Sequence, residues 1–230
     1  QSTYLVEAQP MKMAAAEGLY DDSGDPASWA VWANIDTENK KVSGALEIPY
    51  LLSYLSYGEF AGKVEGMNTI QTQYEEQFGE GNYIPPVKTT FWSFRIMVAV
   101  GGLMILLSLI GLIYSRRRTI ENKSFYLKLM VGSISFPFIA NTFGWIMSEM
   151  GRQPWIVQGL METSTAVSPN VSAGSILFSL ITFSTVYALL AAAMVFLFVK
   201  TIKQGPNAKP KDNINATDPF STGGAEHATK

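Results

Sequence analysis

The sequence contains no cysteine and a single histidine, His227, among its 230 residues. The absence of cysteine excludes disulfide bonds and metal sites built on thiolates. His227 lies in a polar tail, so no histidine side chain lies in or near the apolar runs of the chain. The formal net charge is only −2, and no nucleic-acid partner is expected. Any cofactor chemistry must therefore use other donors of this chain, or donors of another polypeptide.

Three apolar runs are each long enough to cross a bilayer, which takes roughly 20 residues. The runs span residues 91–114, 125–149 and 173–199. The middle run also contains polar residues, among them Lys128, Asn141 and Glu149. Polar atoms within a membrane must face protein, cofactor or water, so we expect this segment to lie inside a bundle. The sequence predicts a mainly α-helical, polytopic membrane protein with three transmembrane helices in a bundle.

The distribution of basic residues predicts the orientation in the membrane. Most lysines and arginines near the apolar runs lie in the link 115–124 and in the tail 200–230, which we therefore expect to be cytoplasmic. The link 150–172 holds only Arg152, and residues 1–90 carry five lysines against thirteen acidic residues, a net charge of −8. Both of these segments are expected on the extracytoplasmic side.

Residues 1–90 are expected to form a small α+β loop domain. Helices are predicted at residues 10–17, 50–57 and 67–78, and two strands at residues 29–35 and 42–48 around a polar turn. The polar segment 205–230 is predicted to be disordered. Because the chain begins at Gln1 with neither an initiator methionine nor a signal-like segment, we expect a piece of a longer protein that starts inside an extracytoplasmic loop.

The end of the middle apolar run carries an ionisable side chain, Glu149. A carboxylate at membrane depth is costly, so Glu149 is a candidate functional residue. Gly151 can end a helix, Pro154 cannot continue one, and Trp155 suits the lipid headgroup layer. Arg152 adds a fixed cation beside the carboxylate, where an anionic group could dock. A simple interfacial ion pair between Glu149 and Arg152 is the alternative.

Four motifs together resemble one known family. They are Gln-Pro-Met-Lys-Met-Ala-Ala-Ala-Glu at residues 9–17, Phe-Arg-Ile-Met-Val at 94–98, Gly144-Trp145 with Glu149, and Gly-Arg-Gln-Pro-Trp at 151–155. Their order and spacing resemble the C-terminal part of subunit I of the bacterial cytochrome bd-type quinol oxidases, in the branch with a short quinol-binding loop. The resemblance implies quinol oxidation at the extracytoplasmic face and reduction of dioxygen to water, with electrogenic proton uptake. It also implies three haems, two of type b and one of type d or a third of type b.

The resemblance assigns haem-related roles to five residues. It makes Met97 an axial ligand of the low-spin b haem and associates Arg95 with the same haem. It makes Glu149 a ligand or near-ligand of a high-spin haem at the oxygen site, with Trp145 against a haem edge and Arg152 on a propionate. Simpler interpretations stay open: a packing methionine, a snorkelling arginine, an interfacial tryptophan, and a cation that favours a helix C-terminus.

Lys12 and Glu17 carry the quinol hypothesis. Quinol oxidation needs a proton acceptor at one hydroxyl and a donor that holds the other oxygen. An ammonium and a carboxylate about one and a half helical turns apart could flank one ring, and the family implicates such a pair. Gln9, Met11 and Met13 are expected only to line the site. The alternative from the residues alone is a solvated helix surface.

The resemblance also implies partners for this chain in a bacterial plasma membrane. They are the N-terminal half of the same subunit with its histidine haem ligands, and a second large subunit; small accessory subunits are left open. Two alternatives remain from the residues alone. One is a haem-free transporter with Glu149 and Arg152 as its ion site, and the other is an assembly subunit. Asn141 and Ser148 fit a proton route and helix–helix hydrogen bonding equally well.

Overall fold

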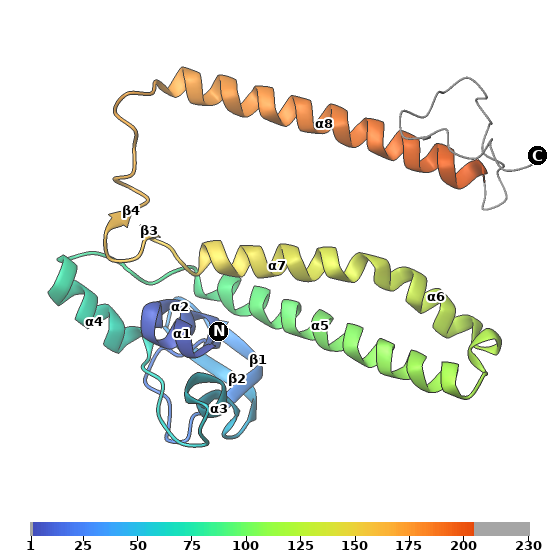
Figure 1. The fold of residues 1–230 in the computed structure, drawn as a ribbon. Coiled ribbons are helices and arrows are strands. Elements are labelled where there is room, and N and C mark those ends of the chain that lie inside the picture. Colours follow the sequence, from blue (N-terminus) through green and yellow to red (C-terminus); the bar gives the residue numbers. More distant parts are fainter. Residues whose placement is uncertain (1, 205–230) are drawn as a thin grey trace, which may run out of the picture. The chain divides into compact units, whose positions relative to one another are not determined.

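The structure is a computed structural model that describes residues 2–204 (Figure 1). The N-terminal region contains α1 (Ser2–Ala8), α2 (Pro10–Glu17), β1 (Trp29–Asp36), β2 (Lys41–Ile48), α3 (Leu51–Tyr57) and α4 (Met67–Phe78). It is followed by α5 (Val87–Arg116), η1 (Ile120–Asn122), α6 (Ser124–Gly132), η2 (Ser133–Ser135), α7 (Phe136–Met150), β3 (Trp155–Val157), β4 (Met161–Glu162) and α8 (Ala173–Gln204). The chain divides into two compact units, residues 1–167 and 168–230, so α8 is described by itself.

The predicted mainly helical class with three long apolar helices is confirmed. The stretches Val87–Arg116, Ser124–Met150 and Ala173–Gln204 are each long and apolar enough to cross a membrane. The helices extend beyond the predicted apolar runs, because polar residues such as Lys200 and Lys203 are good helix formers. The predicted disorder at 205–230 falls outside the described residues.

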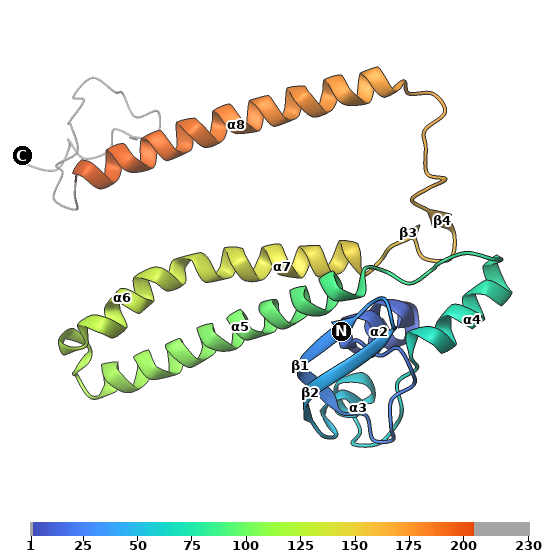
Figure 2. The same cartoon turned by 180° about the vertical axis from the view of Figure 1, so that it is seen from behind.

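The second long stretch is not one uniform helix. A 3₁₀ turn separates α6 from α7, and Pro137 in the first turn of α7 has no N–H to donate to the preceding turn. In the same turn the hydroxyls of Ser133 and Ser135 donate to the carbonyl oxygens of Met130 and Gly132, at 2.7 and 2.9 Å. The chain reverses between α5 and α6, and α7 runs antiparallel along α5 (Figure 2). The end of α7 therefore returns to the level at which α5 begins.

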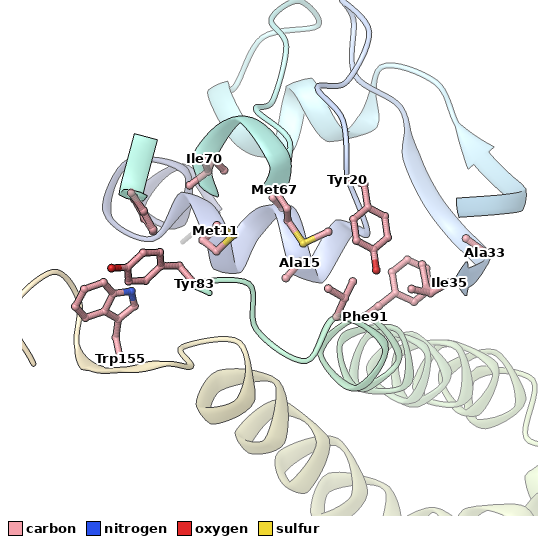
Figure 3. Close-up of a cluster of buried hydrophobic side chains, with 13 residues drawn as sticks. Met11, Ala15, Tyr20, Ala33, Ile35, Met67, Ile70, Tyr83, Phe91 and Trp155 are labelled. Atoms are coloured by element: carbon pink, nitrogen blue, oxygen red, sulfur yellow. The ribbon is translucent and has the colours of Figure 1, made fainter. Parts of the chain in front are cut away.

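The N-terminal region has its own hydrophobic core, centred on α2 (Figure 3). Ala14 and Ala15 are fully buried, and their small side chains allow α4 and α5 to approach this helix. Phe91 from the first turns of α5 and Met67 from α4 are also fully buried in this cluster. The start of α5 is thus part of the loop domain as well as of a candidate membrane span.

The predicted limits of α2 are confirmed. Pro10 occupies the first turn, where its missing N–H costs no hydrogen bond. Gly18 ends the helix in the left-handed conformation with φ of 72°, and the amide of Leu19 donates to the carbonyl of Ala14 at 2.9 Å. A Cβ at Gly18 would also lie only 3.1 Å from the Phe91 ring. Both conformation and space require glycine at this position.

The structure also contains elements that the sequence pattern did not indicate. Helix α1 precedes the predicted first helix, and the short antiparallel pair β3–β4 lies in the link after α7. The predicted strands, by contrast, form an antiparallel hairpin in which Trp29 pairs with Ile48 and Asp36 with Lys41.

Candidate functional site

A buried ion pair joins the loop domain to α5. Arg95 of α5 donates from Nη2 to Oε2 of Glu17 at 2.7 Å, and their side chains are only 5% and 2% exposed. Arg95 also donates from Nε and Nη2 to the carbonyl oxygen of Ala30, at 3.0 and 2.7 Å, and from Nη1 to that of Ala16. Its guanidinium carbon lies 3.8 Å from the centroid of the Phe91 ring. One side chain thus holds α2, β1 and α5 together.

Glu17 is therefore not the solvated surface carboxylate that the residues alone allowed. Burial raises the pKa of the Glu17 carboxyl, and the positive charge and hydrogen bond of Arg95 oppose this rise. Arg95 is likewise not a snorkelling interface arginine, because its charge faces protein.

The other end of α2 contacts the end of α7. Lys12 is 8% exposed and donates from Nζ to Oγ of Ser148 at 3.4 Å. Burial lowers the pKa of the Lys12 ammonium, the nearby Arg152 lowers it further, and Glu149 opposes this effect. Glu149 and Arg152 form an ion pair within one turn, with side chains 40% and 35% exposed. Lys12, Glu149 and Arg152 consequently form one charged cluster with a net positive charge.

The sequence predicted that Lys12 and Glu17 flank one quinol ring. The structure places both on α2 and buries both, but it gives them different partners. The ammonium of Lys12 is directed to α7 and the carboxylate of Glu17 to α5. Gln9 precedes this helix, and its Oε1 atom is buried without a hydrogen-bond partner among the described residues.

Met97 and Trp145 lie on the paired helices α5 and α7. The Met97 side chain is partly buried, and its Sδ lies 2.9 Å from the point where a Cβ of Gly144 would stand. Trp145 is 66% exposed, one turn before Glu149. Within residues 2–204 no group of three or more His, Cys, Asp or Glu side chains is placed to hold a metal ion.

Met97 and Glu149 could each supply a single donor atom to a haem iron. The Met97 thioether on α5 is partly buried with its Sδ facing Gly144 of α7, and the Glu149 carboxylate at the end of α7 belongs to a side chain that is 40% exposed. Each of the two could supply one donor atom to a haem iron, and the remaining donors would come from another part of the protein.

Trp155 was predicted at the lipid headgroup layer, but the structure covers its side chain with protein. The side chain is 5% exposed and stacks on Tyr83, with ring centroids 5.5 Å apart and an interplanar angle of 8°. The Phe78 ring of α4 packs edge-to-face on Trp155 with the ring centroids 5.0 Å apart, and Gln158 donates to the Tyr74 hydroxyl at 2.9 Å. The segment after α7 therefore packs against α4 through an aromatic cluster of Tyr74, Phe78, Tyr83 and Trp155.

The sequence analysis assigned no functional role to two residues that lie beside the charged cluster. Thr90 is fully buried at the start of α5, and Gly151 is buried at the end of α7. Gly151 has φ of −71° and ψ of −12°, so it ends α7 without the left-handed conformation that often selects glycine there. Local sequence patterns do not reveal why residue 151 is glycine, because the residues that surround it come from segments that are distant in the sequence.

Comparison with known proteins places these contacts in a family. Residues 1–206 match the protein-family model described as cytochrome bd terminal oxidase subunit I, and the chain belongs to this family. It is 56% identical over 222 residues to cytochrome bd ubiquinol oxidase subunit 1 of Bacillus subtilis (strain 168), covering 96% of this chain and 47% of that protein.

Two less similar proteins that match the chain are also bd oxidase proteins. The chain is 35% identical over 205 residues to the putative cytochrome bd menaquinol oxidase subunit I of the same organism, covering 88% of this chain and 43% of that protein. The solved structure of the bd oxidase from Geobacillus thermodenitrificans matches with a TM-score of 0.65 at 28% identity, covering 89% of this chain and 44% of that one. The chain thus spans about half the length of the relatives that it matches.

Proposed function

We propose that this chain is the C-terminal part of the catalytic subunit of a bd-type quinol:dioxygen oxidoreductase. Quinol is oxidised at the extracytoplasmic face, where its protons are released. Its electrons, with protons taken up from the cytoplasm, convert dioxygen to water, so that the reaction is electrogenic. The support is the family membership together with one structural observation: α2 contacts both helices that carry the candidate haem residues.

The residues of α2 supply the quinol chemistry in this proposal. Glu17 accepts a proton from a quinol hydroxyl, and Arg95 holds its carboxylate in place. Lys12 donates a hydrogen bond to a quinol oxygen from its position beside Ser148. Because the two side chains have different protein partners, the quinol must approach from a side of α2 that both can reach. Gln9 is a further lining residue of this site.

The haems, two of type b and one of type d or a third of type b, supply electron transfer and dioxygen binding when they are present. Met97 would supply a thioether donor to the low-spin b haem. Glu149 would supply a carboxylate donor to a high-spin haem, Trp145 would pack against that haem, and Arg152 would pair with a propionate. The exposed faces of Trp145 and Glu149 leave room for such a group.

The complex needs further polypeptide. The N-terminal half of the subunit supplies histidine ligands, and a second large subunit completes the oxidase. Residues 1–90 face the outside of a bacterial plasma membrane, and the link 115–124 and the tail 200–230 face the cytoplasm, as the positive-inside rule predicts.

A visible reduced-minus-oxidised spectrum of the purified complex, wild type beside Met97→Leu, tests the proposal. Leucine keeps the volume of the side chain but cannot ligate iron. We expect loss of the low-spin b signal while the high-spin signals remain. A wild-type complex without haem would instead support the transporter or assembly alternatives.

A further inference from the structure

Gly151 lies where three segments that are distant in the sequence meet. A Cβ built on this residue would stand 2.9 Å from Cγ of Lys12 on α2 and 3.1 Å from Cγ2 of Thr90 on α5. It would also stand 2.8 Å from the carbonyl oxygen of Met147, one turn earlier. Carbon atoms without a bond pack at about 3.5–4.0 Å, so no other side chain fits there without movement.

The backbone conformation does not explain why this residue is glycine. Gly151 is in the ordinary right-handed helical region, which every L residue adopts readily. Its amide donates to the carbonyl of Met147 at 3.0 Å, as in a regular helix. Glycine is therefore needed at this position because Lys12 and Thr90 occupy the space that a side chain would take.

The Lys12 atom that would collide with a Cβ of residue 151 lies close to the Lys12 backbone. Cγ is two bonds from Cα, and the residue is only 8% exposed. Relief requires rotation about χ1 of Lys12 or a shift of α2. Either movement takes the ammonium away from Ser148 and from the Glu149–Arg152 pair.

We propose that Gly151 is a positioning residue for quinol binding, because it lets the stem of Lys12 cross the end of α7 and places the ammonium there. This inference rests on the quinol role of Lys12 in the proposed function. Gly151 itself does not contact the quinol. Its contribution is the close approach between α2 and α7.

The test is a steady-state quinol titration of the whole oxidase in four forms: wild type, Gly151→Ala, Lys12→Ala, and the double variant. Gly151→Ala should raise KM for quinol about tenfold, the scale of a lost hydrogen bond to a charged group, with a smaller effect on kcat. Lys12→Ala has no Cγ to displace, so adding Gly151→Ala to it should leave KM unchanged. Gly24→Ala is the matched control, since its nearest neighbour lies 3.8 Å away.

The outcomes separate the two proposals. If Lys12→Ala leaves KM unchanged, the quinol role of Lys12 is wrong and the inference falls with it. If Lys12→Ala raises KM but Gly151→Ala does not, or if Gly151→Ala acts equally in both backgrounds, only the positioning role is overturned. KM does not depend on the fraction of enzyme that carries haem, so a lower haem content in Gly151→Ala leaves the comparison valid, and an unchanged KM in the haem-loaded fraction overturns the inference.

Discussion

The Arg95–Glu17 pair provides the most direct test of how the loop domain is held on α5. Arg95→Met removes the guanidinium and leaves the Glu17 carboxylate buried, with the carbonyl oxygens of Ala16 and Ala30 also deprived of their donor. Removing one partner of a buried ion pair typically costs about 3–5 kcal/mol. Glu17→Gln keeps an acceptor for Arg95, so it should cost only about 1.5–3 kcal/mol.

An exposed ion pair in the same domain is the matched control. Lys63 donates to Asp22 at 2.8 Å, but its side chain is 55% exposed. Such surface pairs contribute about 0–1 kcal/mol, so Lys63→Met should have little effect. The expected order of destabilisation is Arg95→Met, then Glu17→Gln, then Lys63→Met.

Amide hydrogen exchange of α2 in the whole oxidase measures this order. Local opening governs exchange, and a loss of about 3 kcal/mol should increase the exchange rate of the α2 amides about a hundredfold. Peptides from α8 serve as an internal reference. Exchange in Arg95→Met no faster than in Lys63→Met would refute the view that the buried pair holds α2 on α5.

Three further predictions concern the loop domain. Trp155→Ala should destabilise the contact of α4 with the segment after α7 by about 3–5 kcal/mol, because it removes the ring stacked on Tyr83, and limited proteolysis should then cut that segment faster. Gly66→Ala should lower the yield of assembled complex, because its Cβ would overlap the backbone of Asp21 and lie 2.7 Å from the amide nitrogen of Asp22. Hydrogen bonds from the Gly66 amide and Lys63 lower the pKa of Asp22 from 3.8 to about 2. This stabilisation is present above pH 4 and is lost as the pH falls toward 2, so Asp22→Asn should flatten the exchange profile of that loop across this range.

Much of the local structure could be predicted from the sequence. The apolar runs indicate the long helices, because crossing a bilayer requires a continuous apolar stretch. Pro10 and Gly18 mark the limits of α2, because each residue restricts the backbone in its own way. The four motifs were sufficient to identify the family, and the family comparison confirms this identification.

The partners of the charged residues were decided only by the tertiary structure. Arg95 is 78 residues from Glu17, and Lys12 is 136 residues from Ser148, so no local pattern links them. Motif spacing suggested that Lys12 and Glu17 act as one pair, but packing around α2 directs one to α7 and the other to α5. Trp155 looks like an interfacial residue in the sequence and is buried because α4 folds over it. Sequence determines which segments are helical and apolar, because those properties depend on neighbouring residues. Which polar groups meet depends on how distant segments pack, and that is decided by the fold.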